Sequence, residues 1–109
     1  MAILNGYRIM WILVMFDLPV LTEKERKEAG RFRKFLLDLG FERCQLSVYM
    51  RCCSGKEKVE RHVRRIKDAL PTGGQVDILS FTDKQYENIV SFRATIRRDR
   101  KKPEQLMLF

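Results

Sequence analysis

The sequence predicts a two-layer α+β domain of the ferredoxin-like kind, with the order βαββαβ and extra strand content at the C-terminal end. Three observations predict it: an unbroken apolar run over 10–16, two amphipathic helical patterns after it, and strand-like stretches between and beyond those patterns. The chain has 109 residues, 45% of them apolar, which suits a single domain with its own core. This fold hosts many functions, so function has to be argued from particular residues.

The first predicted strand is the element around which the others are organised. The run from Met10 to Phe16 contains no cap or turn former and is too short to cross a bilayer. We interpret it as a strand buried on both faces, although periodicity alone leaves a buried helix open. Asp17 follows at once, and Leu18-Pro19 ends the strand because proline lacks an N–H and restricts the residue before it. We therefore expect the Asp17 carboxylate at the rim of a central strand, within reach of solvent.

The first helix is predicted to begin at a capping box and to end at a glycine. Thr22 and Glu25 have the spacing of the box, and Gly40 is suited to the C-cap. The apolar stripe between them consists of Ala29, Phe32, Leu36 and Leu39. The roughly opposite side is basic, with Lys24, Lys27, Arg31 and Lys34 on it and Arg26 and Arg33 beside it.

Residues 41–53 alternate along the chain, which predicts either one long kinked strand or two short strands. No Gly or Asn marks a tight turn inside them. One face holds Cys44, Leu46, Val48, Met50 and Cys52, and the other holds Arg43, Gln45, Ser47, Tyr49 and Arg51. We expect Cys44 and Cys52 to be small core residues. The adjacent pair Cys52-Cys53 does not have the spacing of a metal site.

The second half of the chain predicts a helix, a strand and several short additions. A second capping box, Ser54 to Glu57, precedes a helix whose buried stripe is Val59, Val63, Ile66 and Leu70, with Lys58, Arg61, Arg64 and Arg65 turned away from it. A strand over 75–81, a capped turn at Thr82 and a further strand over 88–95 follow. The domain is expected to span 1–96, and 97–109 form a basic linker with a short C-terminal strand.

The charge of the chain indicates its class of partner. The formal net charge is +8, and the usual partners of such an excess are nucleic acid or an anionic membrane. No stretch has the pattern of a signal peptide or a membrane span, and three cysteines without a signal sequence suit the cytoplasm. His62, the one histidine, stands among arginines and is expected to be a surface residue. The basic helix faces could also be ordinary solvated surfaces.

A family resemblance becomes specific over several segments that occur in order. They are Phe16 to Pro19, Arg31 to Leu37, Gln45 to Tyr49 and Ile78 to Tyr86. Together they resemble the small CRISPR adaptation protein, the ferredoxin-like partner of the CRISPR spacer integrase, and they are closest to the branch found with type II systems. The resemblance implies a homodimer that bridges two integrase dimers and holds a short DNA duplex. It also implies, for some members, a metal-dependent nuclease that cuts RNA or DNA.

The resemblance assigns a role to Asp17, since the acid after the first strand is the family's proposed ligand for Mg²⁺ or Mn²⁺. Many members carry tyrosine before this acid, whereas this chain has Phe16 and so no hydroxyl there. Without the resemblance, the favoured interpretation is that Asp17 accepts hydrogen bonds from backbone N–H groups of its turn. A lone carboxylate supplies too few ligands for Mg²⁺ unless a second copy of the chain or phosphate oxygens complete the coordination shell.

Three hypotheses follow from the sequence: a DNA-binding scaffold for CRISPR adaptation, an endonuclease that uses Asp17, and a ferredoxin-like RNA-binding or regulatory module outside CRISPR. In the first, the apolar C-terminal tail adds a strand to the integrase or the dimer mate, or else packs on its own sheet. The residues expected to contact nucleic-acid phosphates are Lys27, Arg31, Arg33, Lys34, Arg61, Arg64 and Arg65. Those expected to contact the partner are Leu106, Met107, Leu108 and Phe109.

Overall fold

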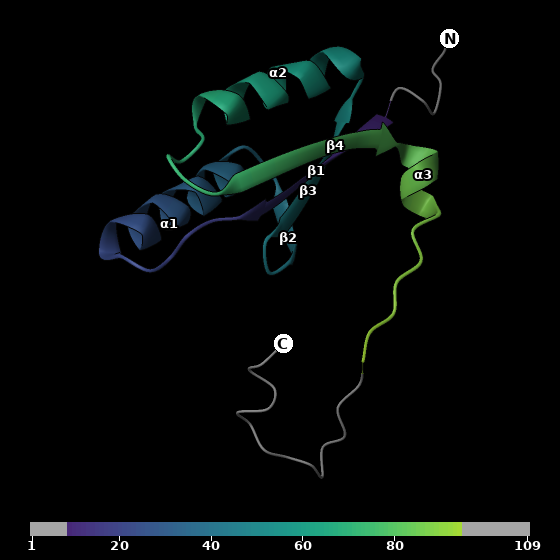
Figure 1. The fold of residues 1–109 in the computed structure, drawn as a ribbon. Helices are drawn as coiled ribbons and strands as arrows, with labels where there is room; N and C mark the ends of the chain where they lie inside the picture. Colours follow the sequence, from purple (N-terminus) through teal and green to yellow (C-terminus); the bar gives the residue numbers. More distant parts are fainter. Residues whose placement is uncertain (1–8, 95–109) are drawn as a thin grey trace.

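Strand β1 (Ile9–Asp17) lies inside a four-stranded antiparallel sheet of order β2-β3-β1-β4, in a computed structural model that describes residues 9–94 (Figure 1). The other strands are β2 (Glu42–Gln45), β3 (Val48–Ser54) and β4 (Gln75–Thr82). The helices are α1 (Glu23–Asp38), α2 (Lys56–Asp68) and the short α3 (Asp83–Glu87). The order of the elements and of the strands confirms the predicted ferredoxin-like fold.

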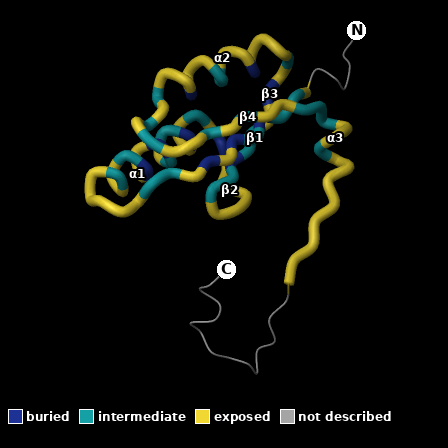
Figure 2. The backbone as a smooth tube through the Cα atoms, in the orientation of Figure 1, coloured by how far each residue is buried: buried dark blue, intermediate teal, exposed yellow. Residues whose placement is uncertain are grey.

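One face of the sheet is covered by α1 and α2 and contains the core. From β1 it receives Ile12, Val14 and Phe16, of which Ile12 and Val14 are fully buried. The helices and the neighbouring strand supply Phe32, Leu36, Tyr49, Cys53, Val59 and Ile66, with Phe41 from the α1–β2 connection (Figure 2). Because successive strand residues point to opposite faces, the remaining residues of β1 lie on the other side.

That second side is not covered by either long helix, so the prediction that β1 is buried on both faces was wrong for the described chain. Trp11 and Leu13 are half-buried, and Met15 is 39% exposed. Cross-strand pairing places apolar residues of β3 and β4 beside them. We call this surface the open sheet face, and it consists of Trp11, Leu13, Met15, Val48, Met50, Leu79 and Phe81.

Residues 41–53 form a hairpin, the second of the two predicted alternatives. Gln45 pairs with Val48, so the connection is only Leu46-Ser47, and the ladder is irregular between Arg43 and Gln45. The predicted inward face was wrong, because Tyr49 and Cys53 are buried whereas Cys44 and Cys52 are exposed. The apolar alternation there belongs to the open sheet face, which a single sequence cannot distinguish from the core face.

Local signals fixed most helix ends. Thr22 Oγ1 accepts from the Glu25 N–H at 3.1 Å, and the Glu25 carboxylate accepts from the Thr22 N–H at 3.0 Å, which confirms the first capping box. Thr82 and Gln85 form a second such box at α3. Gly40 directly follows the C-cap residue of α1 with φ +92°, a conformation that favours glycine.

Two expectations for α2 were wrong. Its N-cap is Gly55, with no side-chain hydrogen bond, because Ser54 is the last residue of β3. Leu70 is 45% exposed, since the helix ends at Asp68 and the apolar stripe stops with it.

The C-terminal additions differ from the prediction as far as they are described. Residues 88–94 form no strand, and Ile89, Val90 and Phe92 are exposed. The linker 97–102 and the predicted strand with Leu106, Met107, Leu108 and Phe109 lie outside the described residues. No helix within 9–94 has the length and apolar character needed to cross a membrane.

Candidate functional site

Asp17 is the exposed last residue of β1, at the edge of a shallow hollow of about 350 Å³. Met15 and Phe16 of the same strand line the hollow with Gln75 and Asp77 of β4. Since Asp17 pairs with Gln75 and Met15 pairs with Asp77, both carboxylates stand on the open side of the sheet as diagonal neighbours. The Gln75 Nε2–H donates to Asp77 Oδ2 at 3.0 Å.

Asp77 is the residue that sequence reasoning missed beside Asp17. The alternation of 75–81 puts Gln75 and Asp77 on one face, but only the register of β4 on β1 shows that this face is the one with Asp17. Gly74 makes the close pairing possible. It has φ +87°, and a Cβ there would lie 2.5 Å from the Asp17 carbonyl oxygen.

The donor set of the hollow suits a hard divalent cation but does not complete a site. Asp17, Asp77 and the Gln75 amide oxygen are oxygen donors of the kind that Mg²⁺ and Mn²⁺ prefer. Within residues 9–94, no group of three or more His, Cys, Asp or Glu side chains is arranged to hold a metal ion. One chain would therefore offer only part of a coordination shell, and a bound cation would need water, phosphate or another chain to complete it.

The predicted phosphate-contacting residues of α1 do not all have the same surroundings. Lys27, Arg31 and Lys34 are exposed, and Lys34 pairs with Asp38 at 3.2 Å. Arg33 is half-buried, with its guanidinium carbon 5.8 Å from the centre of the Phe16 ring. Arg33 therefore also stabilises the core through a cation–π contact.

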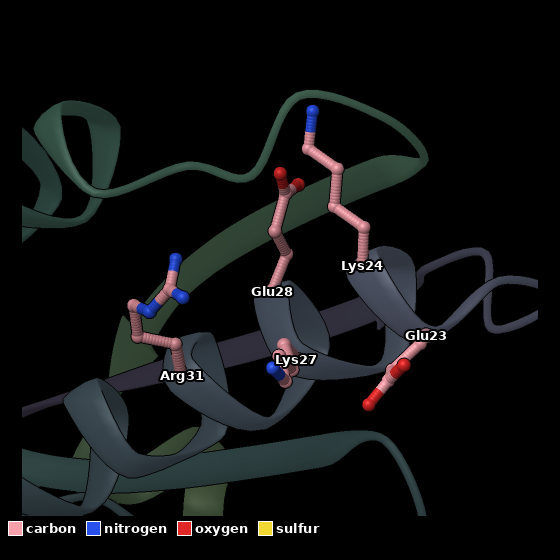
Figure 3. Close-up of a pocket in the computed structure, with 5 residues that line it drawn as sticks. All are labelled: Glu23, Lys24, Lys27, Glu28 and Arg31. Carbon is pink, nitrogen blue, oxygen red and sulfur yellow. The ribbon is translucent and has the colours of Figure 1, made fainter.

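A further hollow of about 350 Å³ on α1 is lined by cations and two acids, Glu23 and Glu28 (Figure 3). In the picture, Glu28 and Lys24 extend to the same side of the helix. The Thr72 hydroxyl donates to Glu28 at 2.9 Å. This hydrogen bond and that from the Thr72 N–H lower the pKa of Glu28, and Lys24 and Arg31 lower it further. Glu28 thus ties α1 to the α2–β4 connection and also offsets part of the local positive charge.

On α2, Arg61, Arg64 and Arg65 are exposed. Because the apolar stripes of α1 and α2 face the same side of the sheet, their basic residues share the outer surface of the helical layer. We call this surface the basic helical layer: Lys27, Arg31, Lys34, Arg61, Arg64 and Arg65. Asp17 lies on the opposite side of the sheet, so the structure does not bring all predicted site residues into one cluster.

His62 is half-buried and not a simple surface residue, contrary to the prediction. Its ring meets Phe41 edge to face, with centroids 6.2 Å apart, and its Nδ1 is buried without a hydrogen-bond partner. Burial lowers the pKa of His62 below its ordinary value of 6.5, and the nearby Arg51, Arg65, Arg61 and Lys58 lower it further. His62 does not line the Asp17 hollow, so it is not placed to act as a base there.

The fold, the strand-end carboxylate and the basic helical layer define a small ferredoxin-like protein with a basic outer helical surface. The family model described as CRISPR associated protein Cas2 matches residues 10–89, and the chain belongs to this family. The predicted family resemblance is therefore confirmed, whereas its type II branch stays a prediction. Membership also favours the two CRISPR hypotheses over a module outside CRISPR.

Named relatives and a solved structure agree with this assignment. The chain is 51% identical over 107 residues to a protein named CRISPR-associated endoribonuclease Cas2 from Paracidovorax avenae, covering 97% of this chain and 99% of that protein. It is 47% identical to a protein of the same name from Flavobacterium psychrophilum, covering 97% and 93%. A structure titled "Crystal structure of cas2" superposes with a TM-score of 0.57 at 21% identity, covering 86% of this chain and 95% of that one, which supports the fold alone.

Proposed function

We propose that this protein is a homodimeric DNA-binding scaffold for CRISPR adaptation in the cytoplasm, where it bridges integrase dimers and holds the prespacer duplex. The observation that carries the proposal is the open sheet face. Family membership supports the CRISPR context. The basic helical layer on the other side of the sheet supplies the positive charge that binding of a DNA duplex requires.

The open sheet face is suited to pairing with a second copy. It is a contiguous apolar surface built from three neighbouring strands, with Leu13 flanked by Met50 and Leu79 and Trp11 flanked by Phe81. Contiguous apolar patches of this kind are uncommon on proteins that act alone. A twofold interface uses the same patch on both subunits, so a flat apolar sheet face can pack against the same face of a second copy.

The basic helical layer is suited to phosphate groups and not to base edges. Among residues 9–94 the one ion pair within 4.0 Å is Lys34–Asp38, so the arginines of α2 are not neutralised by direct partners. Phosphate contacts give sequence-independent affinity that falls with salt, which is the behaviour a scaffold for varied DNA needs.

Dimerisation through the open sheet face is tested by Leu79→Arg, with Leu70→Arg as the matched control. Both leucines are 45% exposed, but Leu79 lies on the open sheet face and Leu70 follows α2. We expect Leu79→Arg to be monomeric in sedimentation experiments and inactive in spacer integration with the integrase, and Leu70→Arg to behave like wild type. A dimeric Leu79→Arg would overturn the proposed interface.

We propose metal-dependent endonuclease activity as a second function, and two observations favour it. Relatives at up to 51% identity are named endoribonucleases, and Asp17 stands at a solvent-facing hollow with two further oxygen donors. Asp17 would hold Mg²⁺ or Mn²⁺, and such a cation lowers the pKa of water and stabilises charge on a phosphodiester. No histidine lines the hollow, and its two carboxylates are the donors proposed for the metal, so we expect slow cleavage of RNA or DNA.

One variant, Asp17→Ala, separates the two functions when it is measured in two assays. We expect it to lose cleavage in Mg²⁺ or Mn²⁺ and to keep spacer integration, because scaffolding needs only the open sheet face and the basic helical layer. If a folded, dimeric Asp17→Ala fails to integrate, the scaffold proposal is wrong. If it still cleaves, Asp17 is not the metal ligand.

A further inference from the structure

A third hollow, lined by Met10, Ser54 and the first residues of α2, lies at the other end of β1 from Asp17. Figure 1 shows that α2 begins near that end of β1. The hollow has a volume of about 710 Å³, twice that of the Asp17 hollow. Met10 and Thr82, which pair across β1 and β4, form one wall. Ser54 and the start of α2 form the other. Four residues of β1, Trp11 to Val14, at about 3.3 Å each separate Met10 in this hollow from Met15 in the Asp17 hollow, and the two hollows share no lining residue, so they are independent sites.

The charge around this cavity is predominantly positive. Lys56, Lys58 and Arg61 line it, and Glu57 is the one acid among the described residues of the lining. None of the three cations forms an ion pair within 4.0 Å with a described residue. Cations that gather at a cavity without acidic partners repel one another, and an anion placed among them relieves that repulsion.

The volume of the cavity and its Met10–Thr82 wall indicate which kind of anion the cavity can bind. Small-molecule pockets usually measure about 300–1,000 Å³, so this cavity can take more than a bare ion. Met10 is half-buried and offers a polarisable thioether of the kind that packs against flat rings. Thr82 Oγ1 already accepts from the Gln85 N–H, which leaves its hydroxyl hydrogen free to donate.

We propose that this cavity binds a nucleotide through its phosphate, with the phosphate at Lys58 and Arg61 and the base against Met10. The ligand is either the phosphorylated terminal nucleotide of a strand or a free mononucleotide, since both present the same chemistry. The inference goes beyond the proposed scaffold. Binding of the nucleotide requires neither the open sheet face nor Asp17. It predicts a preference for a phosphate monoester, which duplex contacts along the basic helical layer would not produce.

The test compares Lys58→Glu with Lys67→Glu in the full-length protein. Both lysines are exposed on α2 and both changes alter the net charge equally, but only Lys58 lines the cavity. The probes are a 5′-phosphorylated single-stranded oligonucleotide, the same strand without phosphate, and adenosine monophosphate, with binding followed by fluorescence anisotropy and competition.

We expect wild type and Lys67→Glu to prefer the phosphorylated strand about tenfold, the contribution of one charge-assisted hydrogen bond. Lys58→Glu should lose that preference, and the milder Lys58→Gln should lose most of it. Tighter binding of adenosine monophosphate than of the phosphorylated strand would identify a free nucleotide as the ligand, and the reverse order would identify the strand end. If the phosphorylated strand binds no more tightly than the strand without phosphate and adenosine monophosphate does not bind, or if Lys67→Glu removes the preference as fully as Lys58→Glu, the proposal is wrong. A dimeric protein that integrates spacers without this preference would overturn the inference and leave the proposed function intact.

Discussion

The two faces of β1 are equally apolar in sequence but differ in what covers them. Ile12 and Val14 are fully buried beneath α1 and α2, whereas Met15 on the other face is 39% exposed. The apolar run over 10–16 does not predict this difference, because an apolar strand residue indicates burial but not whether its own chain or a partner buries it. The comparison separates residues that stabilise the monomer from residues left available to a partner.

The largest effect that this comparison predicts is on α1, the helix that covers the buried face. Leu36 is fully buried against the sheet, and its neighbour Leu37 is 51% exposed. We expect Leu36→Ala to lower the free energy of unfolding by about 2–5 kcal/mol, because it leaves a cavity in the core. Leu37→Ala should change it by less than about 0.5 kcal/mol. Urea denaturation of both variants measures the difference, and similar losses would mean that α1 does not pack as described.

The open sheet face has one anchored region, at Trp11, and this region should show an intermediate effect. The Trp11 Nε1–H donates to Asp83 Oδ1 at 2.8 Å, and the Trp11 ring stacks on Tyr86 with centroids 3.7 Å apart. These contacts hold α3 against the end of the face. Asp83→Ala should lower the free energy of unfolding by about 1 kcal/mol through the lost hydrogen bond.

The emission of Trp11, the one tryptophan of the chain, reports on the same contact. We expect its spectrum to shift in Asp83→Ala and to stay unchanged in the control Glu87→Ala, which alters the exposed end of the same short helix. An equal shift in both variants would show that α3 as a whole, and not the Asp83 contact, sets the environment of Trp11.

What the sequence could predict was local. The capping boxes at Thr22 and Thr82, the strand end at Asp17 and the glycine after α1 each depend on a few adjacent residues, and the structure confirms them. The order of these elements was enough for the fold, because few topologies accommodate βαββαβ.

What the sequence could not predict depends on pairing between distant segments. Asp77 comes beside Asp17 only through the register of β4, and Cys53 replaces Cys44 and Cys52 in the core only because the helices cover that face. A single amino-acid sequence carries no local signal for the strand register or for the face that the helices cover. The same holds for His62, whose helical position indicates the surface although its ring reaches Phe41.

The smallest predicted effect is that of His62, whose ring packs against Phe41 on the face of the sheet that the helices cover. Burial of the imidazole lowers its pKa in the folded protein below 6.5, with Arg51 of β3 and Arg65, Arg61 and Lys58 of α2 adding to the effect. The unfolded chain therefore binds a proton as pH falls through about 6.5, while the folded chain resists it. The contribution of His62 to stability is then complete above that pH and is lost as pH falls towards the lowered pKa.

The non-titrating variant His62→Gln isolates this contribution from that of the carboxylates. Between about pH 7.5 and about pH 5, the free energy of unfolding of wild type should fall more steeply than that of His62→Gln, because only wild type takes up the extra proton on unfolding. The difference should be small, since the ring is half-buried and water screens the arginines. Parallel pH profiles would show that His62 titrates alike in both states, and the buried Nδ1 would then have to be solvated in solution. A steeper fall in His62→Gln would reverse the sign of the argument and indicate that the folded protein favours the imidazolium.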